Sequence, residues 1–138
     1  MLRSSFAAIA LLAMTSVQAL ADDMPPANNK YVVNTGQSTL VWKAEKVTGK
    51  HEGTVSVSNG EILLANGVLK SGSFTIDMSS MLVTDIKDAG MNSKLLGHLK
   101  SDDFFSVDKH KSARFDITAV TAGSQAGSFI VKGNLTIK

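Results

Sequence analysis

Three histidines are the side chains in this sequence that would first be considered for acid–base or metal chemistry. They are His51, His98 and His110. A metal site needs ligands at short, characteristic spacings, and none of the three has another histidine within one helical turn or one strand step. His51 and His110 lie in polar segments with neighbouring lysines, which is typical of solvated loop histidines. His98 lies among leucines, where it would cap or hydrogen-bond the end of a helix. The sequence therefore predicts no metal site.

A second candidate for acid–base chemistry combines His98 with Asp102 and Asp103. General catalysis would require these groups within hydrogen-bond reach of a substrate and with shifted pKa values, and the sequence indicates neither. Aspartates also accept hydrogen bonds from nearby backbone amides, so a turn explains both carboxylates. The chain has neither a G-x-S-x-G segment nor a glycine-rich phosphate loop. We expect a protein that is not an enzyme and needs no cofactor.

Composition excludes further classes of function. The chain contains no cysteine, so disulfides, thiolate metal sites, a cysteine nucleophile and a lipoprotein anchor are all excluded. Its 14 basic and 12 acidic residues are dispersed along the chain. It therefore lacks the basic stripe of a nucleic-acid-binding protein and the polybasic segment of a membrane-surface protein. We expect no nucleic-acid partner.

The first 21 residues are typical of an export signal. Arg3 supplies a positive charge, residues 6–14 form an apolar run, and Ala19-Leu20-Ala21 is an A-x-A cleavage site. A transmembrane helix is the alternative, but the run is shorter than the roughly 20 apolar residues that cross a bilayer. We predict a signal peptide at 1–21, one domain at 22–138 and a periplasmic location.

Most of the remaining chain alternates between apolar and polar residues, as β-strands do. Strands are predicted at 30–34, 39–47, 54–58, 61–65, 68–78, 113–119 and 128–138. Two Asn-Gly pairs, at 59–60 and 66–67, predict tight hairpin turns, because both residue types tolerate the positive φ of a type I′ turn. Residues 48–53 are predicted to form a loop, and Gly133 a bulge or bend. The pattern indicates an all-β, antiparallel meander.

One segment, residues 79–100, departs from the strand pattern. Four apolar residues recur there at helical spacing, namely Met91, Leu95, Leu96 and Leu99. A turn is predicted at 101–103, and the adjacent Phe104 and Phe105 would anchor one element onto another. The expected fold is therefore a β-sheet with a short helical segment between strands.

The segment at 95–105, L-L-G-H-L-K-S-D-D-F-F, resembles the signature of the YceI-like family of bacterial secreted proteins. Three other motifs agree in order: G-S-F-T-I-D-M-S-S at 72–80, K-H-K-S-A-R-F at 109–115, and G-N-L-T-I-K at 133–138. The resemblance implies a lipocalin-like β-barrel crossed by a short helical segment. It also implies binding of isoprenoid or quinone-like lipids in an apolar cavity, without a metal. The family's common R-D-x-H-L arrangement is absent here, so no headgroup contacts are transferred.

Such a cavity would be lined by apolar side chains from separate elements. The candidate ligand-binding residues are Trp42, Phe74, Ile76, Met78, Leu95, Leu99, Phe104, Phe115 and Phe129. An eight-stranded barrel has room either for its own side chains or for one small ligand. Two functions follow. One is a carrier of an isoprenoid-type lipid, which the resemblance favours, and the other is a stress-related periplasmic protein with a packed core that acts through protein–protein contacts.

The chain stops within the last predicted strand. We therefore expect a barrel that lacks its C-terminal strands and stays unclosed at one edge, unless something outside the chain covers that edge. An unpaired strand edge is a template for association. The chain expressed alone is predicted to form homo-oligomers or to be poorly soluble.

Overall fold

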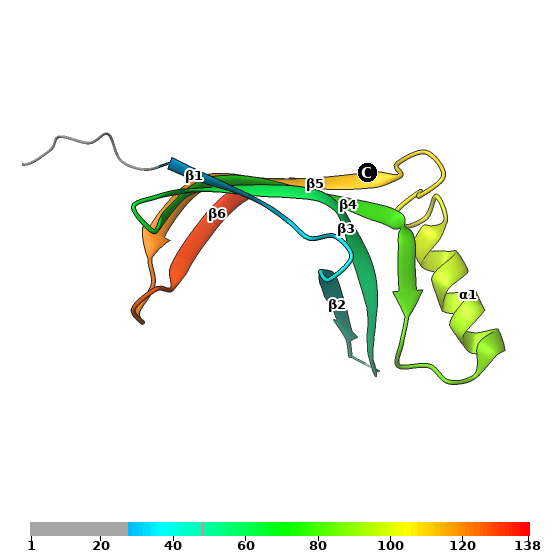
Figure 1. Ribbon diagram of the computed structural model, residues 1–138. Coiled ribbons are helices and arrows are strands. Elements are labelled where there is room, and N and C mark those ends of the chain that lie inside the picture. The colour runs from blue at the N-terminus through cyan, green and yellow to red at the C-terminus, as the bar shows by residue number, and fades with distance from the viewer. Residues whose placement is uncertain (1–27, 48) are drawn as a thin grey trace, which may run out of the picture.

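The computed structural model of the protein describes residues 28–47 and 49–138. The predicted signal peptide at 1–21 lies outside these residues. In chain order the elements are β1 (Asn28–Val32), β2 (Thr39–Lys46), β3 (Gly49–Ala65), β4 (Val68–Val83), α1 (Ala89–Lys100), β5 (Ser112–Ala122) and β6 (Phe129–Thr136) (Figure 1). In the described part of the chain, no helix has the length and apolar character needed to span a membrane.

All the strands join one antiparallel sheet in the order β1-β3-β4-β5-β6, and β2 also pairs with β3. β2 pairs with the first half of β3 and β1 with its second half, so β1 and β2 lie end to end along one edge. β6 forms the other edge. Among the described residues the two edges do not pair, and the sheet forms an open arch (Figure 1). This confirms the predicted all-β, lipocalin-like fold with an unclosed sheet, whereas homo-oligomer formation stays a prediction.

The predicted helix is confirmed as α1. Its first turn is capped by Asp88, whose carboxylate accepts the Met91 N–H at 2.8 Å. At its other end the Ser101 hydroxyl donates to the His98 carbonyl at 2.8 Å. β5 pairs with β4 only along residues 73–77, and α1 lies beside the later part of β4 (Figure 1). Leu99 is buried there, so packing against the sheet holds the helix.

One of the two predicted Asn-Gly turns is confirmed. Asn66 and Gly67 have φ values of 51° and 76° and connect β3 to β4. The loop predicted at 48–53 is wrong, because β3 already begins at Gly49 and pairs with β2 from that residue. Lys50, His51 and Glu52 therefore form cross-strand pairs with β2.

The hairpin predicted at Asn59-Gly60 is also wrong. Both residues lie inside the 17-residue strand β3, and they pair with Thr75 and Phe74 of β4. The register shifts between Val57 and Asn59, as it does at a β-bulge. A Cβ on Gly60 would lie 2.7 Å from the Phe74 ring. The glycine therefore permits close packing instead of a turn.

β4 continues past its predicted end at residue 78 and takes up residues that had been assigned to the helical segment. Asp77 pairs with Ser56, whereas Leu82 pairs with Thr54. β4 thus inserts extra residues between two rungs of the ladder, and inserted residues bend a strand.

Hydrogen bonds fix this kink in β4. The Ser80 hydroxyl accepts the Ser56 N–H at 2.8 Å and donates to the Asp77 carbonyl at 2.6 Å. The Asp77 carboxylate accepts the Ser79 N–H at 2.9 Å. These bonds satisfy polar groups that the kink takes out of the ladder, while Met78 and Met81 both become buried. The motif at 72–80 thus encodes the kink.

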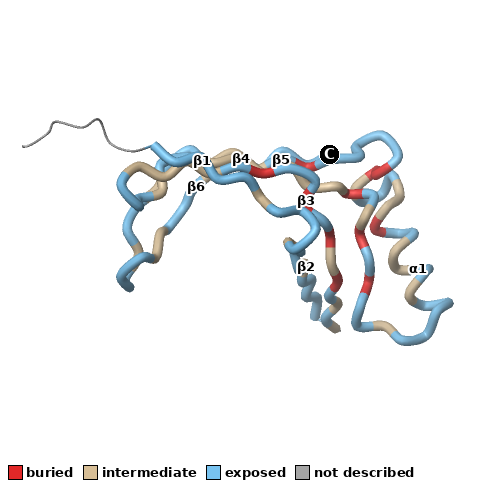
Figure 2. Tube along the Cα trace, in the orientation of Figure 1, coloured by how far each residue is buried: buried red, intermediate tan, exposed pale blue. Residues whose placement is uncertain are grey.

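The hydrophobic core sits where α1 meets the bent parts of β3 and β4. Its buried members are Val55, Met78, Met81, Val83, Leu99, Val107 and Ala113. The tube coloured by burial shows β2 and β6 mostly exposed (Figure 2). The core is therefore concentrated at one end of the arch, and the interior side of the arch remains open.

Candidate functional site

An apolar cavity of about 260 Å³ lies at the core end of the sheet. This volume is slightly below the roughly 300 to 1,000 Å³ that is usual for ligand pockets. Its wall is drawn from β2, β3, β4, β5, α1, the turn after α1 and the C-terminal residues. The lining residues are Trp42, Lys43, Ala44, Val55, Ile76, Met78, Met81, Leu99, Phe104, Phe105, Ala113, Leu135 and Ile137.

The structure brings part of the predicted ligand-binding set together. The candidates that line the cavity are Trp42, Ile76, Met78, Leu99 and Phe104. Among the added lining residues, Ala113, Leu135 and Ile137 belong to the alternating apolar rows of the last two predicted strands. Met81 had no such signal, because it lies beyond the predicted end of its strand.

The other predicted residues lie elsewhere. Phe74 and Phe115 pair with each other across β4 and β5, and the Phe115 ring occupies the space that a Cβ on Gly133 would need. Phe129 pairs with Ala122, at the end of β5 farthest from the pairing with β4. Leu95 packs against the core and lines a shallow surface next to His98. None of these side chains lines the apolar cavity.

Trp42 holds one wall of the cavity in place. Its indole N–H donates to the Leu82 carbonyl of β4 at 3.0 Å, so the ring crosses β3. The residue that pairs with Trp42 on β3 is Gly53, where a Cβ would lie 2.6 Å from the indole ring. The glycine therefore creates the space that the ring fills, and the predicted inward orientation of Trp42 is confirmed by its packing against the core.

Aromatic rings cover the α1 side of the cavity. His98 and Phe104 meet edge to face at 5.8 Å, and Phe104 meets Phe105 in the same way at 5.1 Å. Phe105 packs against the core, whereas Phe104 remains 46% exposed at the mouth. The predicted anchor is thus formed mainly by Phe105. The His98 ring contacts Phe104, whereas the hydrogen bond at the helix end is accepted by the His98 backbone carbonyl and not by its side chain.

Asp102 has the structural role that the sequence predicted. Its carboxylate accepts hydrogen bonds from the Ser106 hydroxyl and from the Lys109 ammonium. The Lys138 ammonium donates to the Asp102 and Phe104 carbonyls at 2.7 and 2.8 Å. These bonds fasten the turn after α1 and the C-terminal residues to each other, beside the cavity.

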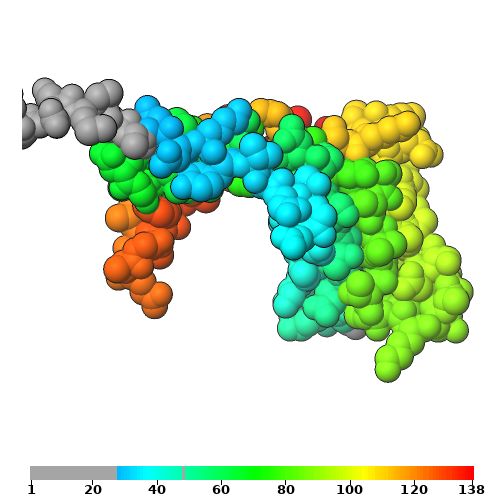
Figure 3. All heavy atoms as spheres, in the orientation of Figure 1, coloured from blue at the N-terminus to red at the C-terminus, as the bar shows by residue number. Residues whose placement is uncertain are grey.

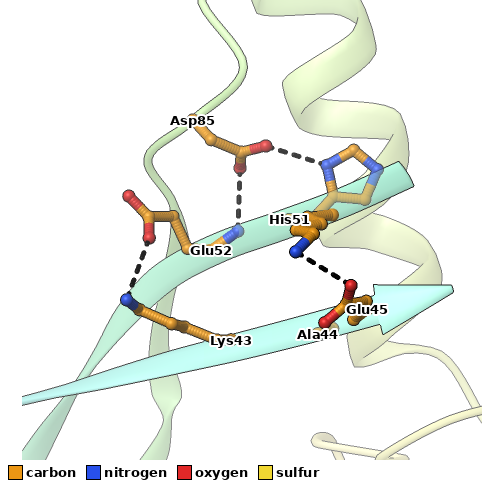
Figure 4. A pocket seen from close by; sticks show the side chains of 7 residues that line it. Lys43, Ala44, Glu45, His51, Glu52 and Asp85 are labelled. Carbon is orange, nitrogen blue, oxygen red and sulfur yellow. Dashed lines mark hydrogen bonds and ion pairs between the residues drawn. The ribbon is translucent and has the colours of Figure 1, made fainter.

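A second, polar cavity of about 430 Å³ lies at the β2–β3 hairpin (Figure 4). β2 supplies Lys43, Ala44 and Glu45 to it, β3 supplies Lys50, His51 and Glu52, and the segment before α1 supplies Asp85. The solvated loop position predicted for His51 is wrong. The residue lies in β3, and its ring Nδ1 is 2.9 Å from the Asp85 carboxylate. Within residues 28–47 and 49–138 no cluster of three or more metal-ligating side chains is found.

Three aspartates have pKa values held below their usual 3.8, each by a local donor. The donors with the largest effect are the His51 ring for Asp85, the Lys109 ammonium for Asp102 and the Ser79 hydroxyl for Asp77. A carboxyl with a lowered folded-state pKa binds protons more readily in the unfolded chain. Its contribution to stability is therefore complete above the usual pKa and is lost as the pH falls through the folded-state value.

We predict that the urea midpoint of unfolding falls as the pH is lowered from about 5 to about 3, because the three carboxyls lose their lowered pKa values on unfolding. The Asp85→Asn variant should start from a lower midpoint and lose less of it over the same interval, because one of the three groups no longer titrates. Urea unfolding followed by circular dichroism at each pH measures the midpoint of the unmodified protein and that of the variant. An acid dependence in the variant as steep as in the unmodified protein would contradict the role assigned to the Asp85 carboxylate.

Comparison with known protein families matches the YceI-like domain to residues 31–138. The match covers almost all of the chain that the structure describes, including every element that lines the two cavities. No curated protein matches the chain.

Proposed function

The chain belongs to the YceI-like family, and from this premise we propose that it binds an isoprenoid-type lipid in the apolar cavity and acts as its periplasmic carrier. Export through the sequence at 1–21 and the absence of enzymatic activity are parts of this proposal. The family membership supports a lipocalin-like binding protein. The choice of an isoprenoid rests on what the family resemblance implies, and the mainly apolar lining of the cavity is compatible with it.

The single observation that carries the proposal is an unfilled apolar space with apolar side chains at its mouth. Leu135, Phe104 and Ile137 line the cavity and remain 57%, 46% and 37% exposed. Exposed apolar patches on soluble proteins commonly mark binding surfaces. A branched hydrocarbon chain would cover them and gain roughly 25 cal/mol for each Å² of apolar area removed from water.

A packed, ligand-free core is the alternative. The space of about 260 Å³ is open at its mouth and lined mainly by apolar side chains, and exposed apolar surface of this kind favours a ligand that covers it. The space-filling view shows an open gap under the arch, between the β6 end and β2 (Figure 3).

Titration with the C20 alcohol geranylgeraniol tests the proposal. Trp42 is the only tryptophan in the chain and lines the cavity, so its fluorescence should shift or be quenched and should saturate as the lipid binds. The Trp42→Phe variant should lose the signal but retain binding of radiolabelled lipid. A fluorescence change that never saturates, together with no retention of radiolabelled lipid by the unmodified protein, would refute the carrier proposal.

A further inference from the structure

The polar and the apolar cavity adjoin along one face of the β2–β3 hairpin. Ala44 lines both cavities. In the ladder Ala44 pairs with His51, and Trp42 pairs with Gly53. Because paired residues of antiparallel strands share a face and side chains alternate with a period of two, His51 projects from the same face as Trp42. An elongated ligand in the apolar cavity that continues past Ala44 therefore reaches His51.

His51 is held in a defined orientation by Asp85. One oxygen of the Asp85 carboxylate accepts the Glu52 backbone N–H at 3.1 Å, and the other lies 2.9 Å from the His51 Nδ1 (Figure 4). The carboxylate is thus fixed to the backbone of β3 while it orients the imidazole. The side chains of His51 and Asp85 are 31% and 26% exposed, so a ligand has access to the pair.

The hydrogen bond also sets the tautomer of the ring. The hydrogen bond with His51 holds the pKa of Asp85 below its usual value, so the carboxylate is ionised at neutral pH and can only accept. Nδ1 therefore carries a proton and donates it to Asp85, so that in the uncharged form of the ring Nε2 presents a lone pair. Among the residues that the structure describes, Nε2 has no hydrogen-bond partner. A ligand group that donates a hydrogen bond would satisfy it.

The charges around the polar cavity favour a neutral donor over an anion. Lys43 lies 3.9 Å from Glu52, and Lys50 lies 2.9 Å from Glu45, so each lysine has a carboxylate partner. Asp85 adds one further carboxylate to this cavity, beside the His51 ring. This excess of negative charge would repel a phosphate. A hydroxyl group is uncharged and can donate a hydrogen bond to Nε2 without such repulsion.

We propose that His51 binds the headgroup of the carried lipid, that Asp85 is its positioning residue, and that the ligand is an isoprenoid ending in a hydroxyl group. The hydrocarbon chain lies in the apolar cavity, passes Ala44, and its hydroxyl donates to the His51 Nε2. This inference rests on the proposed carrier function and names the class of lipid that the site accepts.

The test compares three ligands with one hydrocarbon chain: geranylgeraniol, its methyl ether and its monophosphate. The unmodified protein should bind the alcohol about three- to tenfold more tightly than the ether, which is the net effect expected of one hydrogen bond. It should bind the monophosphate more weakly than the alcohol. In His51→Leu the alcohol should bind only as tightly as the ether, with the affinity for the ether unchanged.

Two further variants separate positioning from general damage. In Asp85→Asn the amide donates to Nδ1, which moves the ring proton to Nε2, so the alcohol and the ether should bind equally. His110→Leu is the matched control, because His110 lies outside both cavities, and its preference for the alcohol should be that of the unmodified protein. Each variant is accepted only when it still binds the ether.

The outcomes distinguish the two proposals. Equal binding of alcohol and ether by the unmodified protein would overturn the headgroup site but leave the carrier function standing. The headgroup site would also be overturned if both His51→Leu and Asp85→Asn kept the preference for the alcohol over the ether, or if the monophosphate bound more tightly than the alcohol. If none of the three compounds binds, the carrier function itself is refuted. If His51→Leu does not fold, the headgroup site is tested by comparing the preference for the alcohol over the ether in the unmodified protein with that in Asp85→Asn.

Discussion

The Gly53→Ala variant is expected to be less stable than the unmodified protein by about 3 kcal/mol, at the upper end of the usual cost of overpacking. The added Cβ would lie 1.8 Å from the Leu82 carbonyl oxygen and 2.6 Å from the Trp42 ring. A backbone carbonyl in a strand and a hydrogen-bonded indole cannot move aside as a flexible side chain would. The ladder between β3 and β4 or the position of Trp42 must therefore change.

Urea unfolding and the Trp42 emission spectrum together measure this effect. Gly49→Ala is the matched control, because Gly49 lies in the same strand and a Cβ there would meet no atom within 4 Å. Its stability should stay within about 0.5 kcal/mol of the unmodified protein, as at ordinary surface positions. Similar midpoints for the two glycine variants would contradict the assigned close approach of Trp42 to β3.

The Ala44→Phe variant is expected to bind the lipid about tenfold more weakly while it keeps its stability. Ala44 is exposed and lines both cavities, so a phenyl ring can enter empty space. If the ring displaced about 60 Å² of lipid contact, the loss at roughly 25 cal/mol per Å² would be about 1.5 kcal/mol, or about tenfold in affinity. In a filled core the same substitution would instead destabilise the fold by about 1 to 3 kcal/mol.

Val41→Phe provides the control for Ala44→Phe. Val41 lies in the same strand, projects from the opposite face and is 62% exposed. The Val41→Phe variant should bind geranylgeraniol as tightly as the unmodified protein does, and its urea midpoint should be unchanged. Equal affinity in the two phenylalanine variants would show that the lipid does not occupy the space beside Ala44.

Local residue patterns predicted most of the fold. Alternation located the strands, the spacing of Leu95, Leu96 and Leu99 located α1, and Asn66-Gly67 formed its expected turn. The errors of prediction arose at residue types that can have more than one structural role. Gly60 permits close packing of Phe74, and the serines that follow Asp77 satisfy a kinked strand. These roles depend on neighbours distant in the sequence, so local pattern favoured the commoner reading as a turn or as the end of a strand.

The candidate site could be predicted only in part. Alternation identifies the face to which an aromatic side chain projects, but its distance from the cavity depends on register, bulges and strand length. Phe74 and Phe115 therefore lie together outside the cavity, although Ile76 next to them on the same strand face lines it. The pairing of His51 with Asp85 joins residues 34 positions apart. It depends on the register of β3 with the end of β4 and on the kink in β4, which the sequence does not indicate.

The measurement that tests the carrier function most directly is mass spectrometry of an organic-solvent extract of the protein as purified. The account predicts an isoprenoid lipid in an amount comparable to that of the protein, with a hydroxyl headgroup, and its depletion from the Ala44→Phe variant purified in parallel. An extract of the unmodified protein without lipid, together with strong destabilisation by Ala44→Phe, would contradict the account and support a packed, ligand-free core.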